Sequence, residues 1–132
     1  MFKFFFPYLK IFFYISNLIL IILYLFPGSL LAYLIYGDLG KQPDFISNPM
    51  GTSINHALAF FYLSILGLTQ DMVGKGFNRT VIFLIILSII LELFHYFVPN
   101  RSFQFLDLFG NLLGAFLAIF IVIFYKKYKK IL

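Results

Sequence analysis

The sequence predicts an all-α, polytopic membrane protein that forms a single domain over residues 1–132. Of these residues 62% are hydrophobic and 11% are charged, which is too little polar surface for a soluble protein of this size. The apolar residues also occur in runs that are long enough to cross a bilayer as helices. We therefore expect four transmembrane helices, at about residues 11–36, 54–69, 80–98 and 105–125.

The first expected span is interrupted by Pro27 and Gly28, which lack a backbone N–H and a Cβ respectively. We expect either a kink in the helix there or a helix followed by a short second piece. No small-residue cleavage site follows the apolar stretch, so we expect it to be retained as a helix and not removed as a signal peptide.

Polar segments separate the four spans. Residues 37–53 contain Gly, Pro, Asp and Ser and predict an exposed loop, and residues 70–79 hold two glycines and three charges, which predicts a tight polar loop. The short stretch 99–102, PNRS, predicts the turn before the last span. An even number of spans places both termini on one side of the membrane.

The distribution of charge predicts the orientation. A net charge of +5 could indicate nucleic-acid binding in a soluble protein, but most of the basic residues lie near the two ends of this sequence. There they indicate membrane topology and contact with anionic lipids, so we expect no nucleic-acid partner.

The loop at 70–79 carries Lys75 and Arg79, whereas the loop after the first span has Asp38 and Asp44 against Lys41. The positive-inside rule therefore places both termini in the cytoplasm.

Ionisable and amide side chains gather near the ends of the last three spans. In this topology they all lie toward the outer leaflet, and helical spacing gives the third and the fourth span one polar face each. The residues of this polar cluster are His56, Glu92, His95, Arg101, Asp107 and Asn111.

The last span also carries small residues at intervals of four. Gly110, Gly114 and Ala118 form a small-xxx-small pattern, which allows a second helix to approach closely. We expect this contact to bring the polar residues of the last span against Glu92 and His95 of the third.

Three functions remain open from these residues. Charged groups inside a membrane usually face a partner or a water-filled cavity. In the first interpretation, the polar cluster forms an outward pocket in which Arg101 binds the anionic headgroup of a lipid or of a cell-envelope precursor. In the second, Arg101 pairs with Glu92 and Asp107 in a closed clasp, and the chain is a structural subunit of a larger membrane complex. In the third, which we favour least, Glu92 or His95 is the general base of an enzyme acting on a membrane substrate.

The sequence gives little support for a metal site or a cofactor. Glu92 and His95 form one E-x-x-H pair to which His56 could add a nitrogen, but di-iron bundles need two such pairs and further glutamates. Zinc hydrolases with an H-E-x-x-H motif need a second histidine one turn away. The chain has no cysteine, which excludes disulfides and thiolate ligands. We therefore assign no metal, no cofactor and no catalytic residue.

The second half of the chain resembles the VanZ-like family of small bacterial integral membrane proteins. The matching residues, which follow His56 at the start of an earlier span, are Glu92, His95, Pro99, Arg101, Asp107, Asn111 and Gly114. The sequence differs from the family pattern at His95, where Gln is common, and at Ala118, where Gly is frequent. The lysine that often precedes the histidine is also absent, since Ile54 and Asn55 occupy that place.

The resemblance implies a multi-pass protein of the bacterial inner membrane with a role in glycopeptide resistance or envelope homeostasis. The family has no settled biochemical activity, so the resemblance supports the fold more than the function.

Overall fold

The computed structural model describes residues 2–41, 53–72 and 75–129, and in these ranges every regular element is a helix. The five helices are α1 (Phe2–Leu25), α2 (Leu30–Tyr36), α3 (Ser53–Gln70), α4 (Phe77–Phe94) and α5 (Phe105–Tyr128). The expected all-α class is therefore confirmed for the described part of the chain.

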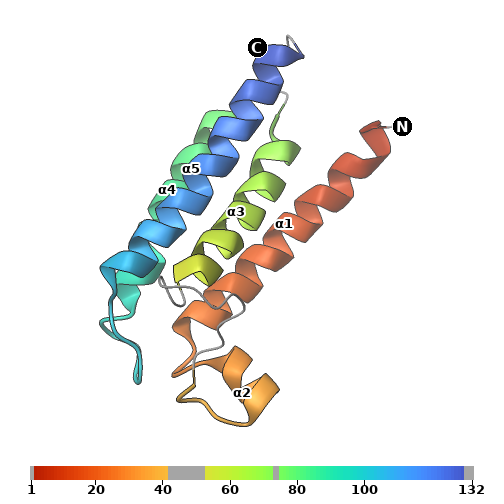
Figure 1. The fold of residues 1–132 in the computed structure, drawn as a ribbon. Coiled ribbons are helices and arrows are strands. Elements are labelled where there is room, and N and C mark those ends of the chain that lie inside the picture. The colour runs from red at the N-terminus through yellow and green to blue at the C-terminus, as the bar shows by residue number, and fades with distance from the viewer. Residues whose placement is uncertain (1, 42–52, 73–74, 130–132) are drawn as a thin grey trace.

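Three of these helices are long and apolar enough to cross a membrane. They are Tyr8–Leu25 of α1, all of α4 and all of α5, with mean hydropathies of 1.9, 2.1 and 2.3. The remaining long helix, α3, lies between α1 and the α4–α5 pair (Figure 1). It makes its most extensive contacts with α5 and also contacts α1 and α4. Its less apolar composition fits this central position, because much of its surface meets protein.

The first expected span is divided into two helices, which is the second of the two forms expected at Pro27 and Gly28. α1 stops at Leu25 and α2 begins at Leu30, so the stretch to Tyr36 is not one kinked helix. Gly28 has a φ of 78°, and a Cβ there would lie 2.8 Å from the carbonyl oxygen of Leu39. The N–H of Ser29 donates to that carbonyl (2.9 Å), and the Ser29 hydroxyl then caps α2. The glycine therefore permits a sharp change of direction that a longer helix could not make.

The third expected span is also shorter at its C-terminal end. α4 ends at Phe94, and residues 95–97 continue in tight turns in which each N–H bonds to the carbonyl three residues earlier. Pro99 has no N–H to extend the helix, and Asn100 has a φ of 59°. The N–H of Arg101 then closes a turn on the carbonyl of Val98 (3.2 Å). This turn directs Arg101 back toward the helices.

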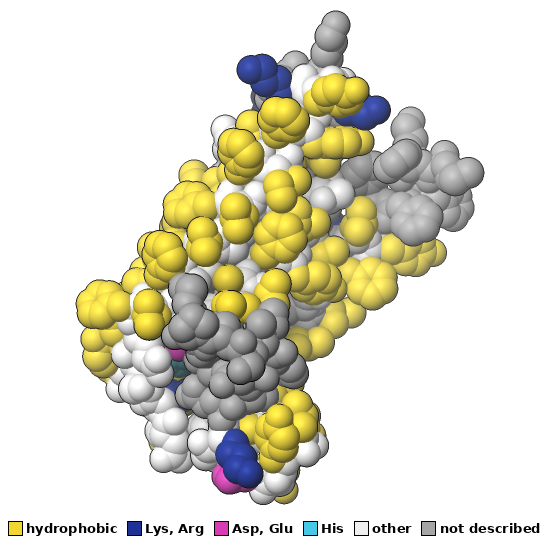
Figure 2. Space-filling model, in the orientation of Figure 1, with side chains coloured by type: hydrophobic (Ala, Val, Ile, Leu, Met, Phe, Trp, Pro, Cys, Tyr) yellow, Lys and Arg dark blue, Asp and Glu magenta, His cyan; other side chains and the backbone are white. Residues whose placement is uncertain are grey.

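Large apolar side chains are exposed along all four long helices. Figure 2 shows hydrophobic atoms over the lengths of the helices, with Lys and Arg side chains near the C-terminal end of α5 and charged groups beside α2. Inside the bundle, an apolar core that includes Phe60, Leu63, Leu68 and Leu84 is almost fully buried. This distribution is typical of a membrane protein, in which the outer surface meets lipid.

Candidate functional site

The six residues of the polar cluster lie at one end of the helical bundle. His56 belongs to the first turns of α3, Glu92 to the last turn of α4, and Asp107 and Asn111 to the first turns of α5. These helix ends meet on the side opposite the two termini (Figure 1). His95 directly follows α4, and Arg101 lies in the connection to α5. The fold thus gathers residues that are up to 55 positions apart.

Glu92 lies at the centre of the cluster and is fully buried. Its Oε1 accepts a hydrogen bond from the N–H of Gln104 (3.0 Å) and lies 3.2 Å from Nδ1 of His95. Its Oε2 has no hydrogen-bond partner among the described residues, and it lies 3.8 Å from Nδ1 of His56. A buried carboxylate oxygen without a hydrogen-bond partner is costly, so a nearby group is needed to stabilise it.

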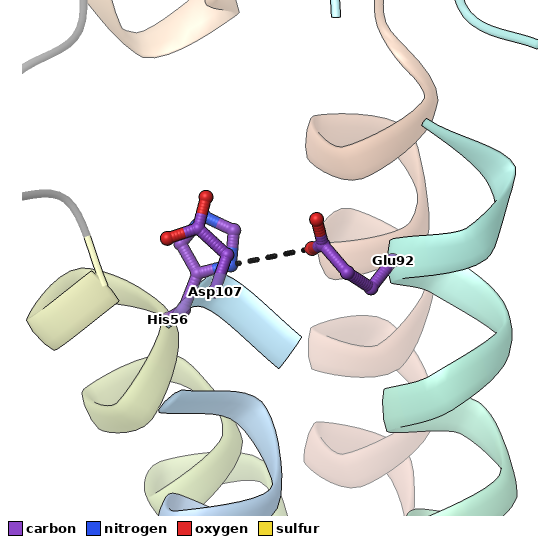
Figure 3. A group of neighbouring side chains, drawn as sticks. All are labelled: His56, Glu92 and Asp107. Carbon is purple, nitrogen blue, oxygen red and sulfur yellow. Dashed lines mark ion pairs between the residues drawn. The ribbon is translucent and has the colours of Figure 1, made fainter. Parts of the chain in front are cut away.

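Asp107 and His56 form the other half of the cluster. Figure 3 shows the two side chains close together, from α5 and α3, with Glu92 pointing toward them from α4. His56 Nε2 lies 3.7 Å from Oδ2 of Asp107, which is beyond hydrogen-bonding distance. The other carboxylate oxygen of Asp107, Oδ1, accepts a hydrogen bond from the hydroxyl of Ser53 (2.7 Å). Asp107 is 4% exposed, so both carboxylates are buried.

Tyr24 of α1 belongs to the same cluster, although the sequence did not single it out. Its hydroxyl donates to Oδ1 of Asn111 (2.6 Å) and lies 2.9 Å from Nδ1 of His56. Its ring stacks on that of His95, with 5.5 Å between centroids. The only signal in the sequence is a tyrosine three residues before the break at Pro27, and the chain has nine tyrosines. That position is equally typical of an interfacial aromatic residue.

This hydrogen-bond chain determines the tautomer of His56. The Asn111 amide nitrogen donates to the carbonyl of Ser88 (3.3 Å), which leaves its oxygen to accept from Tyr24. Because the Tyr24 proton is used in that bond, its oxygen accepts from His56, and Nδ1 of His56 carries the hydrogen. The lone pair of neutral His56 is then on Nε2, the atom that faces Asp107.

Arg101 does not occupy the predicted position. It was expected to pair with Glu92 and Asp107, but within the described ranges no ion pair joins Arg101 to either carboxylate. Its Nη2 donates instead to the carbonyl of Leu23 (3.2 Å), and its buried Nε has no hydrogen-bond partner among these residues. Burial lowers the pKa of Arg101, and nearby acidic groups act in the opposite direction. The turn after α4 holds Arg101 against the end of α1, which explains the difference.

The small residues of α5 contact a different helix from the one expected. A Cβ on Gly110 would overlap the carbonyl oxygen of Ser53, and a Cβ on Gly114 that of Ala57. Both carbonyls belong to α3, so these glycines bring α5 against α3 and not against α4. Ala118 is fully buried one turn farther along. The close approach of α3 and α5 sets His56 beside Asp107.

The buried cluster could bind a cation, transfer a proton or hold helices together. His56, Glu92 and Asp107 offer three ligand atoms that all lie within 4.8 Å of one another. Comparison of the chain with protein-family models, with curated proteins and with solved structures finds no match, so the assignment of function rests on the residues themselves.

Proposed function

We propose that this chain is a VanZ-like protein of the bacterial inner membrane that binds the anionic headgroup of a membrane lipid or of a cell-envelope precursor. It crosses the membrane four times, with both termini in the cytoplasm, and its polar cluster faces the outer leaflet. A role in glycopeptide resistance or envelope homeostasis would follow from binding such a precursor.

The arrangement of the helices supports four spans. α3 has 18 residues, which corresponds to a length of about 27 Å at 1.5 Å per residue, close to the hydrocarbon thickness of a bilayer. It runs beside α1, α4 and α5 through the middle of the bundle (Figure 1). A central helix with fewer apolar residues is tolerated in a membrane when protein surrounds it.

The charges at the two ends of the bundle support the proposed orientation. Lys126, Lys127 and Lys129 lie at the end of the bundle that carries both termini, as do Lys75 and Arg79 in the α3–α4 connection and at the start of α4. At the opposite end, the described residues near α2 include Asp38 as well as Lys41. Excess positive charge favours the cytoplasmic side.

The binding proposal rests on the hydrogen bonding of the Arg101 guanidinium. A closed clasp would pair its guanidinium with the two carboxylates, but its only side-chain hydrogen bond among the described residues goes to the backbone of α1. The guanidinium therefore keeps donors for another group, and its planar array of N–H donors matches phosphate and carboxylate oxygens. Figure 2 shows acidic, histidine and basic atoms reaching the surface together at this end of the molecule.

Replacing Arg101 with alanine is expected to remove a bound anionic lipid from the purified protein. Native mass spectrometry of the protein, extracted gently from its own membrane, measures the bound molecules directly. Arg79→Ala is the matched control, because it removes the same charge from the exposed start of α4, at the other end of the bundle. We expect the control to retain the lipid.

The thermal stability of both variants is measured alongside, since the loss of the Arg101 bond to Leu23 could also weaken the fold. Loss of lipid from a folded Arg101→Ala protein supports the binding site. Equal lipid retention in both variants contradicts it. A wild-type protein that carries only another polypeptide would instead support the structural-subunit function.

A further inference from the structure

Potential ligand atoms of two buried carboxylates and one partly buried histidine converge at the centre of the polar cluster. They belong to His56, Glu92 and Asp107, from three different helices, and one ligand atom from each lies within 4.8 Å of the others. We infer that these three residues bind one divalent transition-metal ion, of which Zn²⁺ fits best. The site does not depend on the proposed lipid binding, and its metal would act as the cation of the cluster.

Each of the two carboxylates is held by one oxygen while the other faces the centre. Glu92 accepts its hydrogen bonds through Oε1 and leaves Oε2 without one among the described residues. Asp107 accepts the Ser53 hydroxyl through Oδ1 and turns Oδ2 toward His56. Side chains that bind a metal are commonly held in this way: one atom binds the metal, and the other accepts or donates a hydrogen bond that orients the side chain.

His56 follows the same pattern. Its Nδ1–H is bound by Tyr24, so the lone pair of Nε2 faces Oδ2 of Asp107 at 3.7 Å. A lone pair that faces a carboxylate oxygen is unfavourable unless a positive charge, of a proton or of a metal ion, lies between them. A metal ion supplies that charge and binds the neutral imidazole through Nε2, which is the usual form of a histidine ligand.

The charge of the cluster also favours a bound cation. Glu92 is fully buried and Asp107 is 4% exposed, and the guanidinium of Arg101 forms an ion pair with neither of them. Among the described residues, two ionised carboxylates beside a neutral histidine would be compensated only by the more distant charge of Arg101, which is costly away from water. One divalent ion neutralises both.

The ligand set and the geometry favour zinc. Zn²⁺ binds histidine nitrogen and carboxylate oxygen at about 2.0–2.2 Å, which places neighbouring ligands of a tetrahedral ion about 3.3 Å apart. Nε2 of His56 lies 3.7 Å from Oδ2 of Asp107, which requires only a small side-chain rotation. The 3.8 Å separation from Oε2 of Glu92 is measured to Nδ1, so the Glu92 side chain must rotate toward Nε2 to share the ion. Mg²⁺ prefers oxygen ligands and retained waters, so a histidine makes it a poorer fit. Three protein ligands leave a fourth position open.

The ligand set differs from the E-x-x-H pair in the sequence. Nδ1 of His95 lies 3.2 Å from Oε1 of Glu92, so His95 orients the glutamate and its ring lies outside the three ligands. The third ligand is Asp107, which close contact between α3 and α5 brings to His56. The sequence could not show this pairing.

Metal binding is tested on the purified full chain, without a polyhistidine tag, after treatment with a chelator. Zn²⁺ alone is titrated in the presence of excess Mg²⁺, and metal analysis gives the stoichiometry. We expect one Zn²⁺ per chain, with an affinity that falls roughly 100-fold or more in His56→Gln, Glu92→Gln and Asp107→Asn. Tyr24→Phe removes only the hydroxyl that orients His56, and its affinity for Zn²⁺ should be about 10- to 100-fold lower than that of the wild-type protein.

Two control variants distinguish this metal site from adventitious zinc binding at the surface and from the lipid site. Asp38→Asn removes an exposed carboxylate from the loop after α2 and should leave the affinity for Zn²⁺ unchanged. Arg101→Ala should bind Zn²⁺ normally even when it loses lipid, so failure of the lipid site and failure of the metal site are distinguishable.

A spectroscopic measurement on the wild-type protein covers the case in which a ligand variant does not fold. Co²⁺ in place of Zn²⁺ should give the visible absorption bands of a tetrahedral site with nitrogen and oxygen ligands, since the chain has no cysteine. A wild-type protein that binds no stoichiometric Zn²⁺, or ligand variants that fold and bind as tightly as wild type, would overturn the inference.

Discussion

Asn111→Ala is expected to be the most destabilising of the conservative truncations in the cluster. Asn111 is fully buried and links Tyr24 of α1 to the carbonyl of Ser88 in α4. Removal of the amide leaves the Tyr24 hydroxyl and the Ser88 carbonyl without these hydrogen bonds, and each unpaired buried group destabilises the fold by roughly 1–3 kcal/mol. The truncation also leaves a small cavity. The free energy of unfolding, measured in mixed detergent micelles, should fall accordingly.

Leu113→Ala is the control for this change. It lies two residues along the same helix and is 38% exposed on the outer surface, so its truncation creates no buried unpaired group. We expect a much smaller loss in free energy of unfolding than for Asn111→Ala. Equal losses in the two variants would show that the hydrogen-bond chain contributes little to stability.

Gly114→Ala is expected to destabilise the protein although alanine is the better helix former. The new Cβ would overlap the carbonyl oxygen of Ala57, and it would also lie 2.9 Å from the amide nitrogen of Phe61. Backbone atoms cannot rotate away, so α5 must move away from α3. Overpacking of this kind costs about 1–3 kcal/mol, which exceeds the gain in helix propensity of about 1 kcal/mol.

Gly67→Ala is a matched control in α3, because it makes the same chemical change against a different neighbour. A Cβ on Gly67 would lie 2.6 Å from the ring of Phe13, which is a side chain and can shift. We expect Gly67→Ala to be tolerated better than Gly114→Ala in unfolding measurements. A larger loss for Gly67→Ala would mean that the α3–α5 contact is more adaptable than the structure indicates.

Gly114→Ala should also disturb the polar cluster. The contact of α3 with α5 sets the distance between His56 and Asp107, so a separation of these helices weakens the binding of any ligand that needs both residues. Zn²⁺ affinity measured on the folded Gly114→Ala protein should therefore fall, while that of Gly67→Ala should change little. This result would connect helix packing to the function of the cluster.

The sequence by itself determined the helical class and the apolar surface. Long apolar runs can satisfy their backbone groups in a membrane only by forming helices, so composition and length are enough. The break at Pro27 and Gly28 was also readable, because both residues act locally on the backbone. Helical spacing was enough to single out Glu92 and Asp107 as members of one polar group.

Only the tertiary structure decided which of these groups contact one another. The sequence suggested Arg101 as the partner of the carboxylates, but the turn after α4 places its guanidinium on the backbone of α1. Tyr24 could not be identified at all, because nothing in a single span tells which of its aromatic residues faces inward. Pairing between helices depends on how closely and at what rotation they approach, and this is set by contacts such as those of Gly110 and Gly114 with α3, which involve residues far apart in the chain.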